Sequence, residues 1–572
     1  MNSGNHPFGI RPLGDVYLLT PNLQIDAHRC RLTGLGTLSI LDDEALLHLV
    51  FGSGFLIPTD FARLAQCSKV LAAFSLHDDL YRANVLKEFG SDCLQLFCGN
   101  WRTTYINKKK SKVMNITNQS KENSLQFLCK GVYSDLLFQS WACSASSIPN
   151  KWWSRDALDS LPRHSATTLS MDDFINNFER PNIPVVITDC VSKWKAYKEW
   201  TFESLKSRFG KTKFHVAGYD IFLSNYLDYL SQGACDADQP LYLFDKDFAI
   251  KSPDLVKDYT IPLYFSNDLF NLLSEYSFTE EMTKTNNHSK NTCIENGIKL
   301  TKPTLKDICR PDHRWLIIGP KKSGSVFHKD PNKTSAWNAC IRGKKKWILF
   351  PPHITPPGVF PSEDGGAVET PVSVMEWFLN FYKRSQTIIR QSTHTVKGGR
   401  GRGGRGGGGR GGGGGGEESY DKSMRLVPME GVVNEGELIY VPRGWWHCVL
   451  NLEDSIAITH NFCSPRGLPE VLHCLKEVKH TISGVPEAHV PLLYDAFRKV
   501  LLQHEPELLK QVEGDNEKGI GEEERNTKEK MIKNQECGND KEITKMKLSI
   551  PTNRDKDDIG RSTEFVLSSL WE

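Results

Sequence analysis

The chain has 572 residues, 39% of them hydrophobic, with 28 Phe and 13 Trp and a formal net charge of +2. This length suggests about two to four folded units, and the composition is sufficient for a sizeable core. The near-neutral charge excludes a global field that favours nucleic acid or a membrane, so any such partner must be recognised by local patches.

The sequence has no features of a secreted or membrane protein. Its first residues, MNSGNHPFGIRPLG, lack the charged and then apolar pattern of a signal peptide. No run of about 18 apolar residues is present, so we expect no membrane span. The 15 cysteines form no CxxC pair, which disfavours a disulfide framework or a cysteine zinc site and favours a reducing interior. We therefore expect an intracellular protein.

The N-terminal quarter of the chain is predicted to be mostly helical. Residues 1–34 are polar and are predicted to be irregular. Residues 35–90 form a compact helical unit, in which Pro58 marks a helix start and the apolar residues after it recur at helical spacing. Residues 91–167 are predicted to be a helical linker region, with one helix at 130–142.

A short basic run, Lys108-Lys109-Lys110-Ser111-Lys112, lies within this linker region. Such a run is compatible with a nuclear-import signal, and a solvated loop is the alternative interpretation. If the run is a signal, the protein is expected in the nucleus, with the cytoplasm as a further location.

From about residue 168 the sequence changes to short β-rich runs bounded by Gly, Pro, Asp or Asn. These runs are PVVITD (184–189), PLYLFD (240–245), RWLIIGP (314–320), SVFHKD (325–330), KKWILFPP (345–352), GELIYVP (436–442) and SIAITHNF (455–462). Many short strands separated by turns favour a sandwich or barrel over a parallel α/β sheet. We therefore predict a mostly β domain over residues 168–470.

A glycine- and arginine-rich tract interrupts this domain. Residues 398–416 have no apolar side chain and therefore cannot form a packed core. We predict a disordered insert at about 385–420, whose arginines either contact RNA or belong to an inert linker. After the domain, residues 471–511 are predicted to be helical and residues 512–572 to be a largely disordered charged tail.

Two segments carry a candidate metal site. His328 and Asp330 are two residues apart on a predicted strand, so their side chains point to the same face. His447 lies at the end of the strand-like run 436–447. Two imidazoles and one carboxylate make the facial triad of non-haem Fe(II) oxygenases, which leaves positions open for cosubstrate and oxygen. A His-x-Asp pair alone is weakly specific, but the β-like context of both segments strengthens the assignment.

An iron of this kind is chelated by the keto-acid end of 2-oxoglutarate, whose distal carboxylate then needs a buried cation and a hydroxyl group. Lys345 opens a predicted strand and is a good candidate for the cation, and Thr459 could donate the hydroxyl. The structural alternative for Lys345 is a solvated strand end. Spacing alone does not choose among Lys344, Lys345 and Lys346.

Residues 314–352 and 436–462 resemble the JmjC oxygenases of the arginine demethylase/lysyl hydroxylase subgroup, also called phosphatidylserine-receptor-like. The long strings DPxxTSAWN and VPxGWWHxVLNL carry the resemblance, which extends over residues 168–470 apart from the insert. It implies a double-stranded β-helix, also called a cupin or jelly-roll barrel, with flanking helices. It also implies an enzyme that uses Fe(II), 2-oxoglutarate and O2 to oxidise a protein side chain.

The resemblance also implies roles for individual residues. The iron ligands of the family correspond to His328, Asp330 and His447. The residues of its cosubstrate pocket correspond to Asn338, Lys345, Thr459, Ser325, Tyr242 and Asn461. Ser325 stands where the family often has Thr and keeps the hydroxyl group. His460 stands where Gln is expected, and the alternation of the strand points it away from the pocket.

Residues 35–90 resemble an F-box, so the whole chain is similar to the F-box/JmjC proteins of plants. Leu41-Asp42 stands where Leu-Pro is usual, and Tyr81 stands where Trp is common. This resemblance implies a Skp-type adaptor of a cullin ubiquitin ligase as a partner. The alternative is a plain helical cap on the oxygenase domain.

Three functions are compatible with these observations. The first is a protein oxygenase that catalyses histone arginine demethylation and/or lysine hydroxylation, with histone tails or RNA-associated proteins as substrates. The second is an F-box substrate receptor that uses the barrel as a binding module, and the third is an RNA-binding protein. The complete triad and cosubstrate set favour the first. Demethylation and hydroxylation are not distinguished, because both need the same iron centre.

Overall fold

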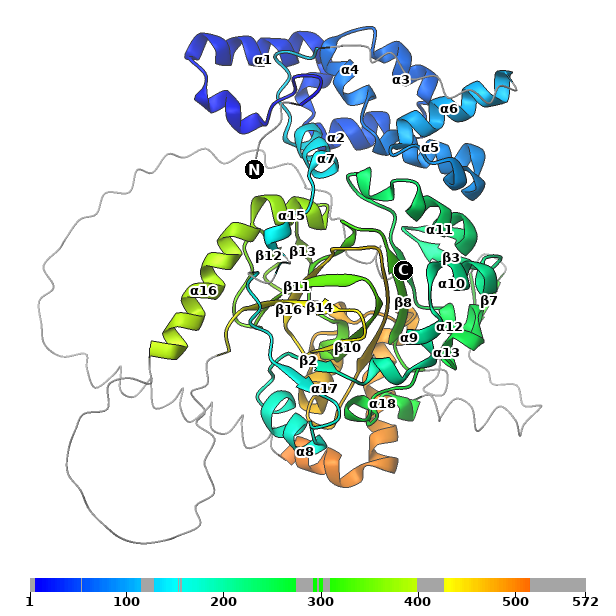
Figure 1. Cartoon of the computed structure of the whole chain (residues 1–572), viewed down its shortest axis with the longest axis vertical. Helices are drawn as coiled ribbons and strands as arrows, with labels where there is room; N and C mark the ends of the chain where they lie inside the picture. The colour runs from blue at the N-terminus through cyan, green and yellow to red at the C-terminus, as the bar shows by residue number, and fades with distance from the viewer. Residues whose placement is uncertain are drawn as a thin grey trace, which may run out of the picture.

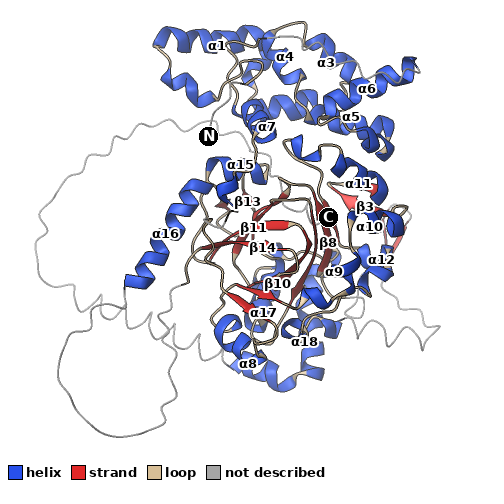
Figure 2. Ribbon diagram, viewed as in Figure 1, coloured by secondary structure: helices blue, strands red, loops and turns tan. Residues whose placement is uncertain are grey.

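The structure is a computed structural model that describes residues 6–52, 54–114, 128–152, 154, 157–273, 292–295, 298–301, 309–398 and 426–514. Within these ranges an N-terminal helical unit lies against a β-rich domain, and further helices cover the opposite end of that domain (Figure 1). Figure 2 shows the strands gathered in the centre and the helices around them. Most of the predicted Gly/Arg insert and of the charged tail lies outside the described residues.

The β-rich domain is built from two main sheets. The larger has the order β1-β2-β15-β10-β17-β8-β5-β3-β4, and the smaller has the order β14-β11-β16-β9. Apart from the parallel pair β1–β2, neighbouring strands are antiparallel. Two antiparallel sheets surrounded by helices confirm the predicted jelly-roll class with flanking helices.

The larger sheet contains β1 (Arg163–Ser165), β2 (Val185–Thr188), β3 (Lys213–Val216), β4 (Tyr219–Phe222), β5 (Leu243–Asp245), β8 (Arg314–Gly319), β10 (Ser335–Arg342), β15 (Leu438–Val441) and β17 (Ser455–Phe462). The smaller sheet contains β9 (Gly324–His328), β11 (Lys344–Phe350), β14 (Met429–Asn434) and β16 (Trp446–Asn451). Two short hairpins pair β6 (Thr292–Glu295) with β7 (Ile298–Thr301) and β12 (Phe360–Pro361) with β13 (Val368–Glu369).

Strands β10 and β17 show how the sheet separates a polar interior face from an apolar outer face. Asn338 pairs with Thr459, and the neighbouring Trp337 pairs with His460. Successive side chains of a strand point to opposite faces. Asn338 and Thr459 therefore line a cavity between the two sheets, while Trp337 packs into the main hydrophobic core.

The N-terminal unit is a layer of helices at one end of the barrel (Figure 1). It contains α1 (Pro21–Leu35), α2 (Asp43–Ala45), α3 (Pro58–Leu64), α4 (Lys69–Ser75), α5 (Asp79–Phe89), α6 (Trp101–Met114) and α7 (Asp135–Ala145). The unit shares the hydrophobic core of the barrel domain. Phe97 and Trp101 contact Tyr229 of α11 (Leu223–Ser231), with ring centroids 4.8 and 5.8 Å from that of Tyr229.

A buried lysine also joins the two parts. Lys322, in the loop between β8 and β9, donates hydrogen bonds from Nζ to the carbonyl oxygens of Cys143, Ser144 and Ser146 at 3.2, 2.8 and 3.1 Å. These carbonyls are at the C-terminal end of α7, where intrahelical partners are lacking. The lysine therefore satisfies them and fixes α7 on the barrel domain.

The prediction that residues 1–34 are irregular was wrong. Leu13–Leu18 form a 3₁₀ helix and α1 begins at Pro21. Leu35 is the only residue of α1 that is buried, so this helix has no apolar stripe that periodicity could detect. Its remaining sequence signal is a proline in the first turn, which is pre-organised for a helix.

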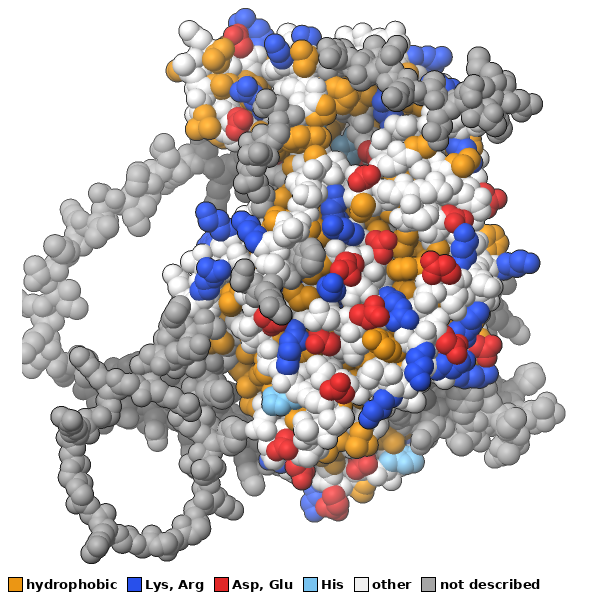
Figure 3. Space-filling model, in the orientation of Figure 1, with side chains coloured by type: hydrophobic (Ala, Val, Ile, Leu, Met, Phe, Trp, Pro, Cys, Tyr) orange, Lys and Arg blue, Asp and Glu red, His pale blue; other side chains and the backbone are white. Residues whose placement is uncertain are grey.

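The other helices flank the sheets. Those of the barrel domain are α8 (Met171–Phe174), α9 (Lys195–Glu199), α10 (Phe202–Phe209), α11, α12 (Phe248–Lys251), α13 (Pro253–Val256), α15 (Val374–Asn380) and α16 (Tyr382–Gly398), and the C-terminal ones are α17 (Leu468–Glu477) and α18 (Val490–His504). None of the helices in the described ranges is long and apolar enough to cross a membrane. On the face drawn in Figure 3, acidic and basic side chains are interspersed.

Two predicted boundaries need correction. Helix α16 continues to Gly398, so the first part of the predicted insert at 385–420 is helical rather than disordered. Ile389 of this helix is buried against the smaller sheet's core, which explains the order. Residues 506–514 are also helical and bury Leu509 and Val512, so the folded part extends past 511 into the predicted tail.

Candidate metal and cosubstrate site

His328 and His447 lie opposite each other in the smaller sheet. His328 ends β9, His447 follows the first residue of β16, and the two are direct cross-strand partners. Asp330 comes just after β9 but keeps an extended backbone, with φ −60° and ψ 143°, so its carboxylate stays on the side of His328. One ligand atom of each of the three residues lies within 4.8 Å of the other two.

The position of His447 differs from the prediction. The sequence was interpreted as one strand-like run ending at His447, but β15 ends at Val441 and β16 begins at Trp446. Gly444 in between has φ +74°, a left-handed conformation that glycine adopts without strain. The turn sends the chain from the larger sheet to the smaller one, which places His447 near the start of its strand.

The backbone orients both imidazoles. Nδ1 of His328 lies 2.8 Å from the carbonyl oxygen of Val326, and Nδ1 of His447 lies 3.1 Å from that of Trp445. Each Nδ1–H donates to its carbonyl, which leaves Nε2 as the metal-binding nitrogen. Burial lowers the pKa of each imidazole to about 4, so both are neutral near pH 7, the form that binds a metal.

Asp330 supplies the carboxylate. Burial raises its pKa to about 6, against the opposing effects of His328 and of a hydrogen bond from Asn461. Its Oδ2 is buried and has no hydrogen-bond partner within the described residues. A buried acceptor without a partner is costly, and a metal ion would satisfy it. Two neutral imidazoles and one carboxylate are a donor set that fits Fe(II).

Lys345 is the one lysine of the three candidates that points into the interior of the barrel. Its side chain is buried, and Nζ donates to Oδ1 of Asn451 at 2.9 Å. Burial lowers its pKa to about 8, and no carboxylate forms an ion pair with it among the described residues. Lys344 is paired with Glu453 at the surface at 2.7 Å. A buried cation without an anionic partner fits a carboxylate ligand.

Lys346 is buried as well. It points to the opposite face of β11 from Lys345, where Nζ lies 3.5 Å from Glu430 and donates to the carbonyl oxygen of Leu158 at 3.1 Å. This buried ion pair belongs to the packing of the smaller sheet rather than to the interior site.

A cavity of about 40 Å³ lies between the sheets. All nine site residues expected from the sequence line it, namely Tyr242, Ser325, His328, Asp330, Asn338, Lys345, His447, Thr459 and Asn461. Within it, Tyr242 forms hydrogen bonds with Ser325 and Asn451, and Oδ1 of Asn338 is buried without a hydrogen-bond partner in the described chain.

Asn451 was missed in the sequence analysis. It is fully buried, accepts from Lys345 and donates from Nδ2 to Ser323 Oγ at 2.9 Å. The signal was available, because Asn451 is four residues after His447 on β16 and a strand repeats its facing every two residues. His460, by contrast, turns away from the cavity as expected: it stacks on Trp337 at 4.5 Å and its Nε2 lies 2.8 Å from the Tyr259 hydroxyl.

A second, larger cavity of about 320 Å³ adjoins the first. The two share Tyr242, Phe244, Ser325 and His328 in their linings. Its remaining lining comes from several parts of the chain, including the N-terminal unit, the β3–β4 hairpin and the start of α15. We call it the outer pocket, and it gives access from the surface to His328.

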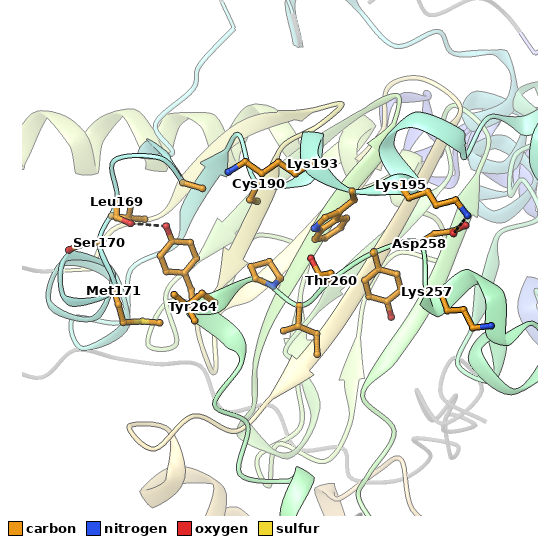
Figure 4. A pocket seen from close by; sticks show the side chains of 16 residues that line it. Leu169, Ser170, Met171, Cys190, Lys193, Lys195, Lys257, Asp258, Thr260 and Tyr264 are labelled. Atoms are coloured by element: carbon orange, nitrogen blue, oxygen red, sulfur yellow. Dashed lines mark hydrogen bonds and ion pairs between the residues drawn. The ribbon is translucent and has the colours of Figure 1, made fainter.

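The structure contains a further cavity, of about 510 Å³, away from these residues (Figure 4). It is bordered by residues 169–171, 193–195 and 257–264. Figure 4 shows Lys195 paired with Asp258, at 2.9 Å, and Tyr264 bonded to the carbonyl oxygen of Leu169, at 2.8 Å. None of the nine site residues lines it, so size alone does not identify the site.

Comparison with known proteins agrees with this geometry. A family model described as a cupin-like domain matches residues 171–466. The chain is 36% identical over 507 residues to the arginine-specific demethylase JMJ22 of Arabidopsis thaliana, covering 88% of this chain and 83% of the relative. It is 29% identical over 367 residues to the bifunctional arginine demethylase and lysyl-hydroxylase psr-1 of Caenorhabditis elegans, covering 63% and 72%.

The chain is also similar to the 2-oxoglutarate and iron-dependent oxygenase JMJD4 of Mus musculus, with 24% identity over 356 residues, 56% of this chain and 66% of the relative. The comparisons do not support the interpretation of residues 35–90 as an F-box. The facing histidines, the buried carboxylate and the cupin-like match lead to one conclusion: the chain belongs to the cupin-like domain family, in its JmjC oxygenase branch, among relatives of the arginine demethylase/lysyl hydroxylase type.

Proposed function

We propose that this chain is an Fe(II)- and 2-oxoglutarate-dependent oxygenase of protein side chains, acting in histone arginine demethylation and/or lysine hydroxylation. The observation that carries the proposal is the convergence of His328, Asp330 and His447 on one cavity, beside a buried Lys345 that has no ion pair with any described residue. Relatives named as arginine demethylases, as a lysyl-hydroxylase and as iron-dependent oxygenases support it.

Different residues of the cavity bind the iron and the cosubstrate. His328, Asp330 and His447 would hold the iron, which together with 2-oxoglutarate and O2 supplies the oxidation of a substrate C–H bond. Lys345 provides the positive charge for the distal carboxylate of 2-oxoglutarate, and Asn451 holds its ammonium group in place. Thr459 and Asn338 add polar groups to the same wall.

The outer pocket is the route for the substrate side chain. It reaches His328 from the surface, and its volume of about 320 Å³ is at the lower end of the range of ligand pockets. Such a pocket suits one long side chain rather than a whole domain. Oxidation of an N-methyl group releases formaldehyde and the demethylated amine, whereas oxidation of a lysine carbon leaves a stable alcohol.

Mass spectrometry distinguishes these outcomes. The full chain is incubated with iron, 2-oxoglutarate and methylated histone or splicing-factor peptides. Demethylation makes the peptide lighter by one CH2 group, and hydroxylation makes it heavier by one oxygen atom. The His328→Ala variant is the control. If neither product forms with any peptide while the wild-type protein is folded and binds iron, the proposed substrate class is wrong.

A second candidate function is recruitment of a Skp-type adaptor by the N-terminal unit. Large apolar side chains of this unit are exposed at Ile40, Leu49, Phe55 and Ile57, and exposed apolar surface is a feature of protein docking sites. The test is a pull-down of the adaptor by the full chain and by its Leu49→Asp, Phe55→Asp variant. Binding that is absent, or unchanged in the variant, would refute this role.

Two further proposals concern segments outside the site. We propose that the Gly/Arg tract contacts RNA through Arg400, Arg402, Arg405 and Arg410. Deletion of residues 398–416 should then abolish RNA binding.

For nuclear import we propose the basic run Lys108–Lys112 as the signal. The run lies on α6 rather than in a loop, with Lys109 paired to Glu88. Replacement of the lysines of this run by alanine should leave the protein in the cytoplasm.

A further inference from the structure

A second group of metal-binding side chains lies where the N-terminal unit meets the barrel domain. His77 lies in the connection between α4 and α5, Asp79 is the first residue of α5, and Asp238 comes from the segment before β5. One ligand atom of each lies within 4.8 Å of the other two. His77 and Asp238 are only 8% and 6% exposed, so the group is an interior feature and not a surface cluster.

One atom of this group lacks a partner. Nδ1 of His77 is buried and has no hydrogen-bond partner in the part of the chain that the structure describes. A buried polar atom without a partner is costly, and a metal ion would satisfy it. Asp238 is held in place by neighbours, since Oδ1 accepts from the Gln239 amide at 2.8 Å and Oδ2 accepts from Ser140 Oγ at 2.7 Å.

The charges around the group are unbalanced. Asp79 and Asp238 lie close enough for their carboxylates to repel each other. Asp78, between His77 and Asp79 in the sequence, adds a third carboxylate. Within the described residues, Arg82 is the cation at ion-pair distance, with Nη1 3.1 Å from Asp79 Oδ1. The three carboxylates of Asp78, Asp79 and Asp238 are thus balanced by one guanidinium, and a metal cation would offset the remaining negative charge.

We propose that His77, Asp79 and Asp238 bind a divalent transition-metal ion, separate from the iron held by His328, Asp330 and His447. One imidazole and two carboxylates suit Zn²⁺, Mn²⁺, Fe²⁺ or Co²⁺ better than Mg²⁺ or Ca²⁺, which prefer oxygen ligands alone. Arg82 and Asp238 line the outer pocket, so the ion has a path from solvent.

A metal at this position links two parts of the fold. Its ligands come from the N-terminal unit on one side and from the barrel domain on the other, so binding stabilises the arrangement in which both face the outer pocket. Because the binding energy of a structural metal contributes to folding, the metal should raise the thermal stability of the whole chain. This effect does not depend on the activity of the iron centre.

Cobalt is a suitable probe, because Co²⁺ replaces other divalent ions and absorbs visible light. The metal-free full chain is titrated with Co²⁺, and bound metal is counted by elemental analysis after gel filtration. We expect two ions per chain for the wild type, one for His77→Gln, one for Asp238→Asn and one for His328→Ala. One ion in the wild type and none in His328→Ala would overturn the proposal.

Thermal unfolding gives an independent reading. In the His328→Ala background, Co²⁺ should raise the Tm in a concentration-dependent way, and the additional Asp238→Asn change should remove that response. Asp238→Asn keeps the shape of the side chain, and circular dichroism establishes that it folds; His77→Gln serves in its place if it does not. An unchanged Tm in His328→Ala at saturating Co²⁺ would contradict the proposal while leaving the iron site unaffected.

Discussion

His328 and His447 are direct partners across the antiparallel strands β9 and β16, with ring centroids 4.2 Å apart. The same ladder continues to the pair Gly324 and Leu450 at the other end of β9. Because the backbone hydrogen bonds fix both strands, the two imidazoles are held together before any metal arrives. A metal site built on paired strands in this way is pre-organised.

The ladder depends on the absence of a side chain at Gly324. A Cβ atom there would lie 1.9 Å from the carbonyl oxygen of Val449, and φ is +155°. Gly324→Ala should therefore separate β9 from β16, lower the free energy of unfolding by about 1–3 kcal/mol and weaken metal binding. Urea unfolding and metal titration measure both effects.

Gly365→Ala is the matched control for this change. Gly365 also has a positive φ, of +72°, but a Cβ atom there meets nothing within 4 Å. The Gly365→Ala variant should lose some stability through backbone strain but should keep its metal affinity. Equal loss of metal affinity in both variants would contradict the role given to the β9–β16 ladder.

Lys345→Met should impair 2-oxoglutarate specifically. The substitution keeps a long side chain but removes a charge-assisted hydrogen bond, worth about 1.5–3 kcal/mol. The KM for 2-oxoglutarate should therefore rise by about 10- to 100-fold, with a smaller change for the peptide substrate. Lys344→Met is the control, since Lys344 pairs with Glu453 at the surface. A KM that is the same in both variants would exclude Lys345 as the carboxylate partner.

The pH dependence follows from the same residue. Burial lowers the pKa of Lys345 to about 8, so the free enzyme carries the ammonium charge below this pH and loses it above. The kcat/KM for 2-oxoglutarate should therefore fall as the pH rises through about 8. In Lys345→Arg the guanidinium stays charged, and any remaining activity should not show this fall. The same fall in both proteins would assign it to another group.

The N-terminal unit should unfold together with the barrel domain. Trp101 is 0% exposed and stacks on Tyr229 of the barrel domain, so Trp101→Ala should cost about 3–5 kcal/mol. If the core is shared, thermal unfolding followed by circular dichroism remains a single transition at a lower temperature. Two separate transitions in the wild type would show that the unit is independent.

The sequence predicted the site better than it predicted the elements around it. His328, Asp330 and His447 were found because strand alternation and metal-ligand chemistry are both local properties. The choice of Lys345 over its two neighbours needed either the family resemblance or the fold. Strand β11 is buried on both faces, and Lys346 is buried on the face opposite Lys345 in an ion pair with Glu430. The sequence Lys344-Lys345-Lys346-Trp347 therefore shows no alternation of polar and apolar residues that would single out Lys345.

Strand β10 shows why some elements escaped prediction. Ser335–Arg342 is a central strand that is buried on both faces, yet its sequence SAWNACIR has few β-branched residues. Small and polar residues are needed there because Asn338 faces the cavity. The sequence between Asp330 and His447 contains strands β10, β11, β14 and β15 as well as the Gly/Arg tract. The tract alone therefore does not account for the distance in sequence between these two ligands.

The most direct test is peptide-dependent formation of succinate from 2-oxoglutarate in the presence of iron. Asp330→Asn keeps the shape of the carboxylate but removes its charge. Loss of a residue that only hydrogen-bonds a metal ligand already lowers metal affinity or activity by about 10- to 100-fold, so a change in a ligand itself should cost at least as much. We therefore predict that the wild type forms succinate together with modified peptide and that Asp330→Asn and His328→Ala are at least about a hundredfold slower. Wild-type rates in folded Asp330→Asn and His328→Ala would contradict the assignment of the iron site.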